Sequence, residues 1–194
     1  TEKPDTYTYD PEHPVMTIGG STCCGEDNLY MVTIGPRDQR PNEARPDVLV
    51  YSTPVLDEDI EVTGPVKLVL YASSSARDTD WVAKLVDVFP DGYAMNAAEG
   101  ILRARYRDSW ESPTLLEPGE VYKFEVDLWS TSNAFLKGHR IRVEVTSSNF
   151  PHYDRNPNTG NPFGQDAELQ KADQTVYHDA DHPSHILLPV VPDA

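Results

Sequence analysis

The sequence predicts an all-β fold: a two-sheet antiparallel β-sandwich with long irregular loops, and a jelly roll as the leading topology. Short segments alternate apolar and polar residues with a period of two, as strands with one wet face do. Turn-forming residues separate these segments at 90–92, 118–119 and 138. A helical 3.6-residue stripe is indicated only over a turn or two at 166–172. Several short strands with turns between them are typical of a sandwich.

The clearest predicted strands cover 122–128 and 141–145, where every second residue is apolar and the residues between them are charged. The segment 81–89 is expected to be another strand, and it places Lys84 on the same face as Val82 and Val86. The remaining expected strands are, in order, 48–51, 66–72, 102–106 and 186–191.

Two segments exceed what a minimal sandwich needs. Residues 1–46 are rich in X-Pro and Gly-Gly pairs and are predicted to form an irregular lead-in, while 47–194 form the sandwich of what is one domain overall. The stretch 147–183 is long for a structureless loop, yet it is too aromatic for a flexible linker. We therefore expect both segments to be ordered by packing on the sandwich or on another domain.

The charge balance excludes several classes of partner. Among 194 residues, 16 Lys and Arg stand against 32 Asp and Glu, which gives a net charge of −16. That field repels nucleic acid and anionic membranes, so we expect neither as a partner. No apolar run approaches the ~20 residues of a membrane span, and none is shaped like a signal peptide. The only cysteines, Cys23 and Cys24, are adjacent and offer no disulfide framework. The composition is that of a soluble protein, and its compartment stays open, with the cytoplasm slightly preferred.

A serine nucleophile would need the Gly-x-Ser-x-Gly elbow on a turn between a strand and a helix. The nearest approach surrounds Ser21, between Gly20 and Gly25, and it has the wrong spacing and no helix after it. A cysteine nucleophile would need a close base, and His13 is the only histidine nearby in sequence. We therefore expect this chain to contain no catalytic triad.

Two clusters are candidates for metal binding. The first lies on a proline-containing loop without preset ligand geometry, and the second lacks the spacing and glycine of a calcium loop. We favour solvated turns and strand faces for both, and expect no metal and no cofactor. The first cluster is His178, Asp179, Asp181, His182 and His185, and the second is Asp78, Asp80 and Asp87.

Three tryptophans, Trp81, Trp110 and Trp129, could form a stacking platform for sugars, because jelly rolls include many lectins. Trp129 is out of phase with the inward-facing residues of the strand before it. Packing in the core or at an interface is the favoured role for these side chains.

Several sequence blocks occur in the order found in one known family. Together they cover nearly the whole chain and resemble the C-terminal domain of the cocaine-esterase/NonD hydrolases and their X-Pro dipeptidyl-peptidase relatives. The blocks are Tyr9-Asp10-Pro11, Gly19-Gly20, GPRDQR at 35–40, DVLVYSTPVL at 47–56, EVTGPV at 61–66, YASSSARDTDWVAKLVDVFPDG at 71–92, EGILRARYR at 99–107, GHRIRVEVTSSNFPHYDRNPNTG at 138–160 and HPSHILLPV at 182–190.

The resemblance implies a galactose-binding-like jelly roll that follows an α/β-hydrolase domain with a helical cap. In such enzymes the Ser-His-Asp triad belongs to the hydrolase domain, which agrees with the missing elbow. The resemblance also implies that the family's domain begins upstream of Thr1. By position, the loop after the Gly-Gly pair would face the substrate, with the small residues Ser21, Thr22, Cys23 and Cys24 in it.

The sequence thus favours a non-catalytic C-terminal domain of a multidomain serine hydrolase that cleaves esters, amides or X-Pro dipeptides. Its expected partner is the α/β-hydrolase catalytic domain of the same parent protein, and a homo-oligomer is a further option. The alternative is a stand-alone jelly-roll module that binds carbohydrate or another small ligand. An elbow motif upstream of Thr1 would support the first interpretation, and a bare start codon would support the second.

Overall fold

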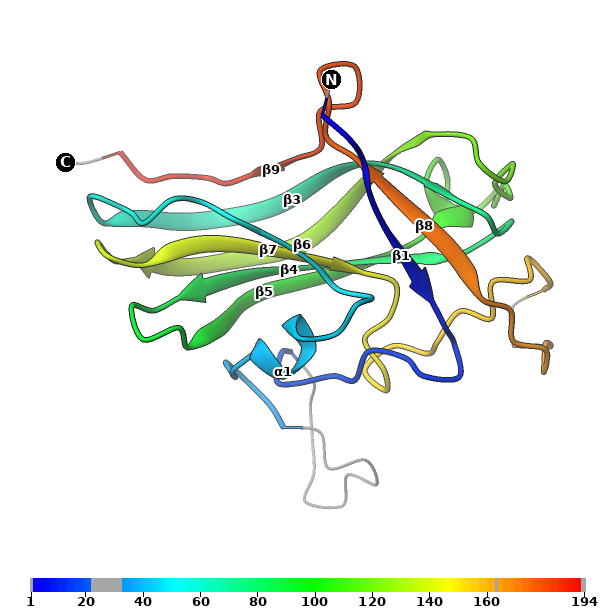
Figure 1. Cartoon of the computed structure of the whole chain (residues 1–194), viewed down its shortest axis with the longest axis horizontal. Helices are drawn as coiled ribbons and strands as arrows, with labels where there is room; N and C mark the ends of the chain where they lie inside the picture. Colours follow the sequence, from blue (N-terminus) through cyan, green and yellow to red (C-terminus); the bar gives the residue numbers. More distant parts are fainter. Residues whose placement is uncertain (1, 22–32, 163, 193–194) are drawn as a thin grey trace.

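Two antiparallel sheets pack against each other in the computed structural model, which describes residues 2–21, 33–162 and 164–192 (Figure 1). The first sheet has the order β1-β8-β3-β6, with β9 paired to β3, and the second has the order β2-β7-β4-β5. The first sheet comprises β1 (Asp5–Tyr9), β3 (Ile60–Ser74), β6 (Tyr122–Phe135), β8 (Ala172–Tyr177) and β9 (His185–Leu187). The second comprises β2 (Leu49–Ser52), β4 (Asp80–Val88), β5 (Ala94–Arg103) and β7 (Arg140–Thr146).

Helix contributes little to the described part of the chain. It is confined there to the single turn α1 (Arg40–Glu43) and the 3₁₀ turn η1 (Ala104–Tyr106). None of this helix has the length or the apolar character of a membrane span. The predicted all-β, two-sheet antiparallel sandwich is confirmed, while the jelly-roll topology stays a prediction.

The core between the sheets is built by the alternation read from the sequence. In β6, Phe124, Val126 and Leu128 point inward and are almost completely buried. Phe124 meets Trp81 of β4, with ring centroids 5.5 Å apart. Removing such side chains from water stabilises the fold by roughly 1.5–3 kcal/mol each. The alternation of polar and apolar residues therefore correctly predicts the strand at 122–128.

Strand β4 is buried on both of its faces. All nine of its residues are buried, although only alternate ones, such as Trp81 and Leu85, belong to the core between the sheets. The other face carries Lys84 and is covered by the segment that precedes β2. Gln39 binds the β5 backbone (N to Ala94 O, 2.8 Å), and Figure 1 shows α1 beside this sheet. The lead-in is thus ordered by packing on the outside of the sandwich.

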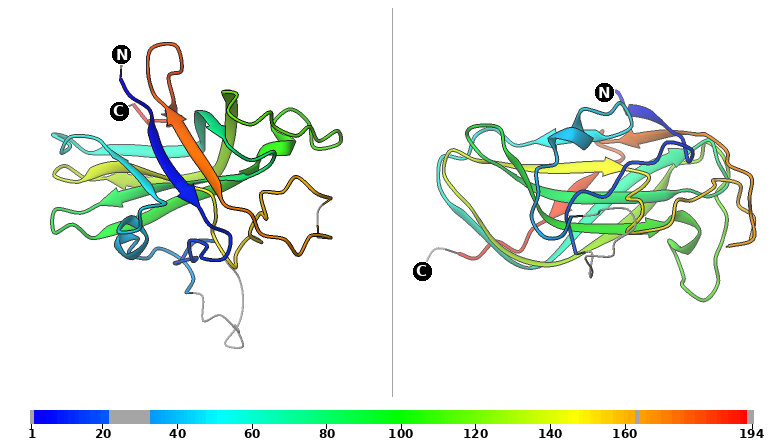
Figure 2. Two further views of the ribbon diagram at one scale, coloured as in Figure 1. Left: turned by 45° about the vertical axis from the view of Figure 1, so that its right-hand side comes forward. Right: turned by 90° about the horizontal axis from the view of Figure 1, so that it is seen from below.

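Some elements differ from the sequence-based expectation. Strand β1 lies within the lead-in and pairs with β8 over its whole length, and both strands run obliquely across the end of the sandwich (Figure 2). Strand β8 begins at Ala172, and no helix forms at 166–172. Its inward positions include Gln174, a polar residue that interrupts the apolar alternation but is fully buried and bonded to Thr79 and Ser147. The expected strand at 102–106 ends at Arg103, and η1 follows.

A β-bulge divides β6 into two halves. Opposite β3, the register runs from Lys67↔Asp127 to Pro65↔Ser130, so β6 has one residue more than its partner. Buried residues occupy even positions up to Leu128, and the inward positions after the bulge are odd, ending at the buried Phe135. An extra residue reverses the facing of everything after it. The bulge lies at Trp129, whose φ of 63° is in the left-handed region.

Candidate functional site

The described residues on either side of the segment after the Gly-Gly pair meet at a narrow neck formed by Gly20, Ser21 and Gly35. Gly20 N donates to Gly35 O and Gly35 N donates to Gly20 O, both at 2.9 Å, so the two ends of the loop are paired. Of the four predicted cleft residues, the structure places only Ser21, at this neck. Thr22, Cys23 and Cys24 lie outside the described residues. The neck therefore fixes where the predicted cleft loop starts and ends.

Gly20 is required at this neck for two physical reasons. Its φ of 87° lies in the left-handed region, and a Cβ added to it would lie 2.0 Å from Glu99 Oε1. The backbone can therefore approach the Glu99 carboxylate only through a glycine. The paired glycines signal this close approach in the sequence, but the group they approach, 79 residues further on, was not predicted.

Glu99 connects the neck to the interior. Its Oε1 accepts from Ser21 N at 3.2 Å and lies 3.2 Å from His152 Nδ1, while Oε2 accepts from Asn149 Nδ2 at 3.2 Å. The Glu99 side chain is 4% exposed, so these contacts replace its hydration. One buried carboxylate thereby holds the start of the loop.

Lys84 links this carboxylate to the sheet. Its Nζ lies 4.0 Å from Glu99 Oε2 and donates to Gln39 Oε1 at 2.8 Å. Strand pairing sets Lys84 opposite Glu99 on one side and opposite Glu144 on the other, which makes a row of acid, base and acid across three strands. Burial lowers the pKa of Lys84, and the two glutamates oppose that shift.

Glu144, at the far end of this row, interacts with the carboxyl group of Glu43. Burial, reinforced by Glu43 and partly opposed by Lys84, raises the pKa of Glu144 from 4.5 to about 8. Oε1 of each glutamate is buried and has no hydrogen-bond donor among the described residues. A proton on Glu144 would give both of these oxygens a hydrogen-bond partner. Arg142 binds the other oxygen of Glu43 at 2.7 Å. The sequence alternation around Glu144 did not reveal this pair, because it predicted a wet face.

A groove of about 440 Å³ runs beside the neck. Its walls are mostly small and apolar, with one large exposed side chain, Trp129, which is 70% exposed. The groove is lined by Gly20, Ser21, Gly35, Pro36, Asn96, Ala97, Ala98, Glu99, Leu128, Trp129 and Ser130. The loop neck and an exposed indole therefore share one surface.

The described residues give Ser21 no catalytic base. No imidazole in that part of the chain accepts a hydrogen bond from its hydroxyl, and the Glu99 carboxylate binds its backbone N–H instead. The imidazole on Glu99, His152, stacks on Tyr153 with ring centroids 4.2 Å apart. The arrangement anchors a loop rather than activating a nucleophile.

The residues of the two metal candidates from the sequence take partners within the protein. His178 Nε2 lies 3.1 Å from Asp5, His182 pairs with Asp179 and His185 Nδ1 contacts Pro183 O. The three aspartates of the second candidate were expected to cap loops or to line a wet strand face, but all three are buried, and each forms an ion pair. These pairs are Asp78 with Arg105, Asp80 with Arg103 and Asp87 with His139. Asp78 and Asp80 also share the side-chain amide of Asn156.

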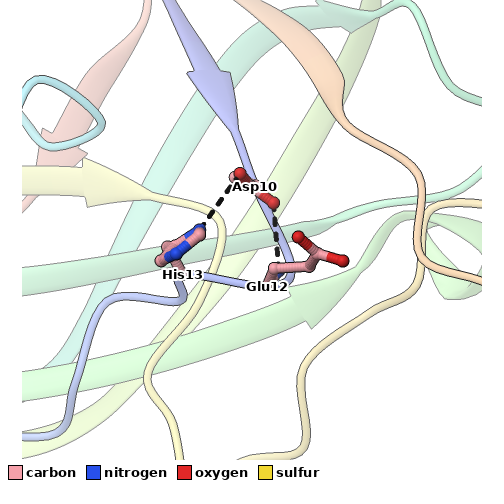
Figure 3. Close-up of side chains that lie close together, drawn as sticks. All are labelled: Asp10, Glu12 and His13. Atoms are coloured by element: carbon pink, nitrogen blue, oxygen red, sulfur yellow. Dashed lines mark hydrogen bonds and ion pairs between the residues drawn. The ribbon is translucent and has the colours of Figure 1, made fainter.

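One cluster that sequence reasoning missed is Asp10, Glu12 and His13, which are close enough to chelate an ion (Figure 3). Asp10 is already engaged there: it accepts from Glu12 N, contacts His13 Nδ1 and pairs with Lys171 at 2.8 Å. Lys171 lowers the pKa of Asp10 to about 2. Figure 3 shows Glu12 and His13 on opposite sides of Asp10, as in a turn closed by an aspartate.

The three tryptophans lie in different environments. Trp81 is in the core and Trp129 is at the groove. Trp110, 74% exposed, stacks on Tyr106 with centroids 5.6 Å apart. Core packing thus holds for Trp81 alone.

Comparison with known proteins defines the class of this domain. The family described as the X-Pro dipeptidyl-peptidase C-terminal non-catalytic domain matches residues 2–187. The chain is 51% identical to a cocaine esterase of Rhodococcus sp. (strain MB1 Bresler), with 98% of this chain and 33% of the esterase aligned. It is 29% identical to a putative serine esterase of Mycobacterium bovis, over 79% of this chain and 25% of that protein.

Solved structures agree with this class. An α-amino acid ester hydrolase matches with a TM-score of 0.88 and 37% identity, over 98% of this chain and 33% of that one. An aminopeptidase from a marine sediment Thaumarchaeota archaeon matches with a TM-score of 0.87 and 35% identity, over 99% and 34%. The chain thus spans about a third of the length of these relatives. It belongs to the X-Pro dipeptidyl-peptidase C-terminal domain family, and the resemblance stated from sequence is confirmed.

The proton on Glu144 makes stability depend on pH in a defined direction. The folded-state pKa of Glu144 is raised, so protonated Glu144 stabilises the folded protein. This stabilisation is fully present below about pH 4.5 and is lost as pH rises through about 8. Glu144→Gln keeps a donor for Glu43 but cannot lose a proton. In the parent chain, urea titrations should show that the free energy of unfolding falls by up to about 1.4 kcal/mol per pH unit over this window. In the Glu144→Gln variant this fall should be absent. Glu125→Gln, on the exposed face of β6, is the control, and an unchanged slope in the Glu144 variant would contradict the protonation of Glu144.

Gly20 and Gly119 form a matched pair for testing the Glu99 contact. Both have left-handed φ values, 87° and 84°, but a Cβ on Gly119 meets nothing within 4 Å. Gly119→Ala should therefore cost only the conformational strain, about 1 kcal/mol. Gly20→Ala should cost about 1–3 kcal/mol more by displacing a buried carboxylate from its donors. Chemical denaturation measures both, and the excess should vanish in a Glu99→Ala background; equal costs in the parent chain would show that the contact is unimportant.

Proposed function

We propose that this domain completes a multidomain serine hydrolase that cleaves esters or amides, and that its 21–34 loop forms part of the substrate cleft. The observation that carries the proposal is the fixed neck of that loop. Gly20 and Gly35 pair with each other, and Ser21 is bound to the buried Glu99. A loop meant to line a site on another domain needs its ends held rigidly by its own domain.

The chemistry of the longer protein is inferred from the names of the relatives. They include a cocaine esterase, an α-amino acid ester hydrolase and an aminopeptidase, all of which transfer an acyl group to water. A serine in an α/β-hydrolase domain of the same polypeptide would form the acyl-enzyme, with histidine as base and aspartate as its orienting partner. This chain would contribute binding surface and none of the triad.

The composition of the loop suggests what it would select. Thr22, Cys23 and Cys24 are small, so a cleft wall built from them would leave more room for the acyl group than leucine or phenylalanine would. Apolar acyl groups gain roughly 25 cal/mol per Å² of surface removed from water, which favours larger groups where they fit. We therefore propose a hydrolase that accepts bulky acyl groups.

Enlarging the loop residues tests this role in the full-length hydrolase. Cys23→Phe and Cys24→Phe should lower kcat/KM for bulky acyl esters about 10–100-fold relative to acetyl esters, because an overfilled pocket penalises size. Ser112→Phe, at an exposed position outside the groove, serves as the control. If both cysteine variants fold and keep the original acyl-size profile, the loop does not line the cleft.

A second measurement tests whether catalysis lies outside this chain. The purified 194-residue chain should show no turnover of p-nitrophenyl acetate above the buffer rate. The full-length hydrolase provides the positive control under the same conditions. Turnover by the chain alone that disappears in Ser21→Ala or Cys23→Ala would place a nucleophile here and contradict the proposal.

A further inference from the structure

We propose that the groove beside the loop neck, together with Trp129, is the surface on which the catalytic domain of the same polypeptide docks. This inference rests on the proposed function, since it names the partner and the contact surface of the same region. The groove joins Ser21 at the neck to Ala97 and Ala98 of β5 and to Trp129 of β6. A domain that contacts Ser21 at the neck would therefore also border this groove.

The fold itself directs Trp129 outward. As the extra residue of the β6 bulge it belongs to neither inward series, and its indole is 70% exposed. The φ angle of Trp129 is 63°, a conformation that bulky residues rarely adopt. Its backbone N–H donates to Asp127 Oδ1 at 2.8 Å. Bulges commonly re-aim one side chain at a functional surface. The result is a large, oriented aromatic group that is mostly exposed.

The groove is also nearly free of available charge, on a domain with a net charge of −16. Among the described residues that line it, the one charged side chain is Glu99, whose carboxylate is already bound to Ser21, Asn149 and His152. Ile34, at the edge of the neck, is 56% exposed. Interface centres are depleted in charge and rich in tryptophan, and such side chains dominate binding energy. The groove has this composition.

The length of the relatives identifies the occupant. This chain aligns with about a third of each, 33% of the cocaine esterase and 34% of the aminopeptidase, and its family is by description the C-terminal, non-catalytic part. The remaining two thirds of such a polypeptide is tethered to this domain at a high effective concentration. A covalently linked domain is therefore favoured over a second copy of the chain as the cover of the groove.

Trp110 provides an internal standard for a test in the full-length hydrolase. It is 74% exposed, nearly the same as Trp129, but it lies outside the groove and lines a different hollow with Tyr106. Hydroxyl-radical footprinting with mass spectrometry gives the oxidation rate of each tryptophan, relative to its rate in the urea-unfolded protein. If Trp129 is docked, its rate should fall about ten-fold or more, because interface tryptophans are enclosed on binding.

Dilution distinguishes the catalytic domain from a second copy of the chain as the partner that covers Trp129. Protection of Trp129 that persists when the enzyme is diluted until it is monomeric, while Trp110 stays reactive, supports docking of the catalytic domain. Oxidation of Trp129 at or near the unfolded rate overturns the proposal. Protection that is lost on dilution also overturns it and assigns the groove to a second copy of the chain. Failure of the acyl-size test with Trp129 still protected would refute only the cleft role of the loop.

Discussion

The row Glu144–Lys84–Glu99 across β7, β4 and β5 is the constraint on which the outer half of this structure depends. An ammonium group on the outer face of a sheet would normally reach water, but Lys84 is only 2% exposed. Removing one partner from a buried charge costs about 3–5 kcal/mol. The covering segment must therefore supply acceptors, and Gln39 does so at 2.8 Å while the flanking glutamates balance the charge.

This constraint extends to the surface through Glu99. The same carboxylate that neutralises Lys84 also accepts a hydrogen bond from Ser21 N, so the loop neck is attached to this buried row of charges. Hydrogen bonds to a buried charged group contribute about 1.5–3 kcal/mol, more than neutral ones. The loop therefore has a rigid base although it emerges from an irregular lead-in. That is the arrangement expected where a binding surface must be positioned by a scaffold.

The sequence predicts the sheet architecture well where one strand face is dry and the other wet. Periodicity locates β6 up to Leu128 and most of β7, because those patterns follow directly from burial. It misses β8, where the buried Gln174 is satisfied by distant partners. It locates β4 but wrongly predicts one wet face there, because both faces of β4 are buried. The glycine pair indicates the loop neck, but Glu99 cannot be recognised from sequence. The groups that form hydrogen bonds with it, on Ser21, Asn149 and His152, lie 50 or more residues away, and only the fold brings them together.

The bulge at Trp129 has a structural cause that does not explain the residue found there. Strands β5 and β6 belong to different sheets and approach so closely that a Cβ on Gly100 would lie 1.9 Å from Asp127 O. Thr131 also donates to Ala97 O across this edge at 3.2 Å. Strand β6 must therefore bend over β5, and a bulge supplies the bend. Glycine or asparagine would adopt the left-handed conformation with less strain than tryptophan. The closure of the sandwich accounts for the bulge, whereas a mostly exposed indole at this position fits the docking surface proposed above.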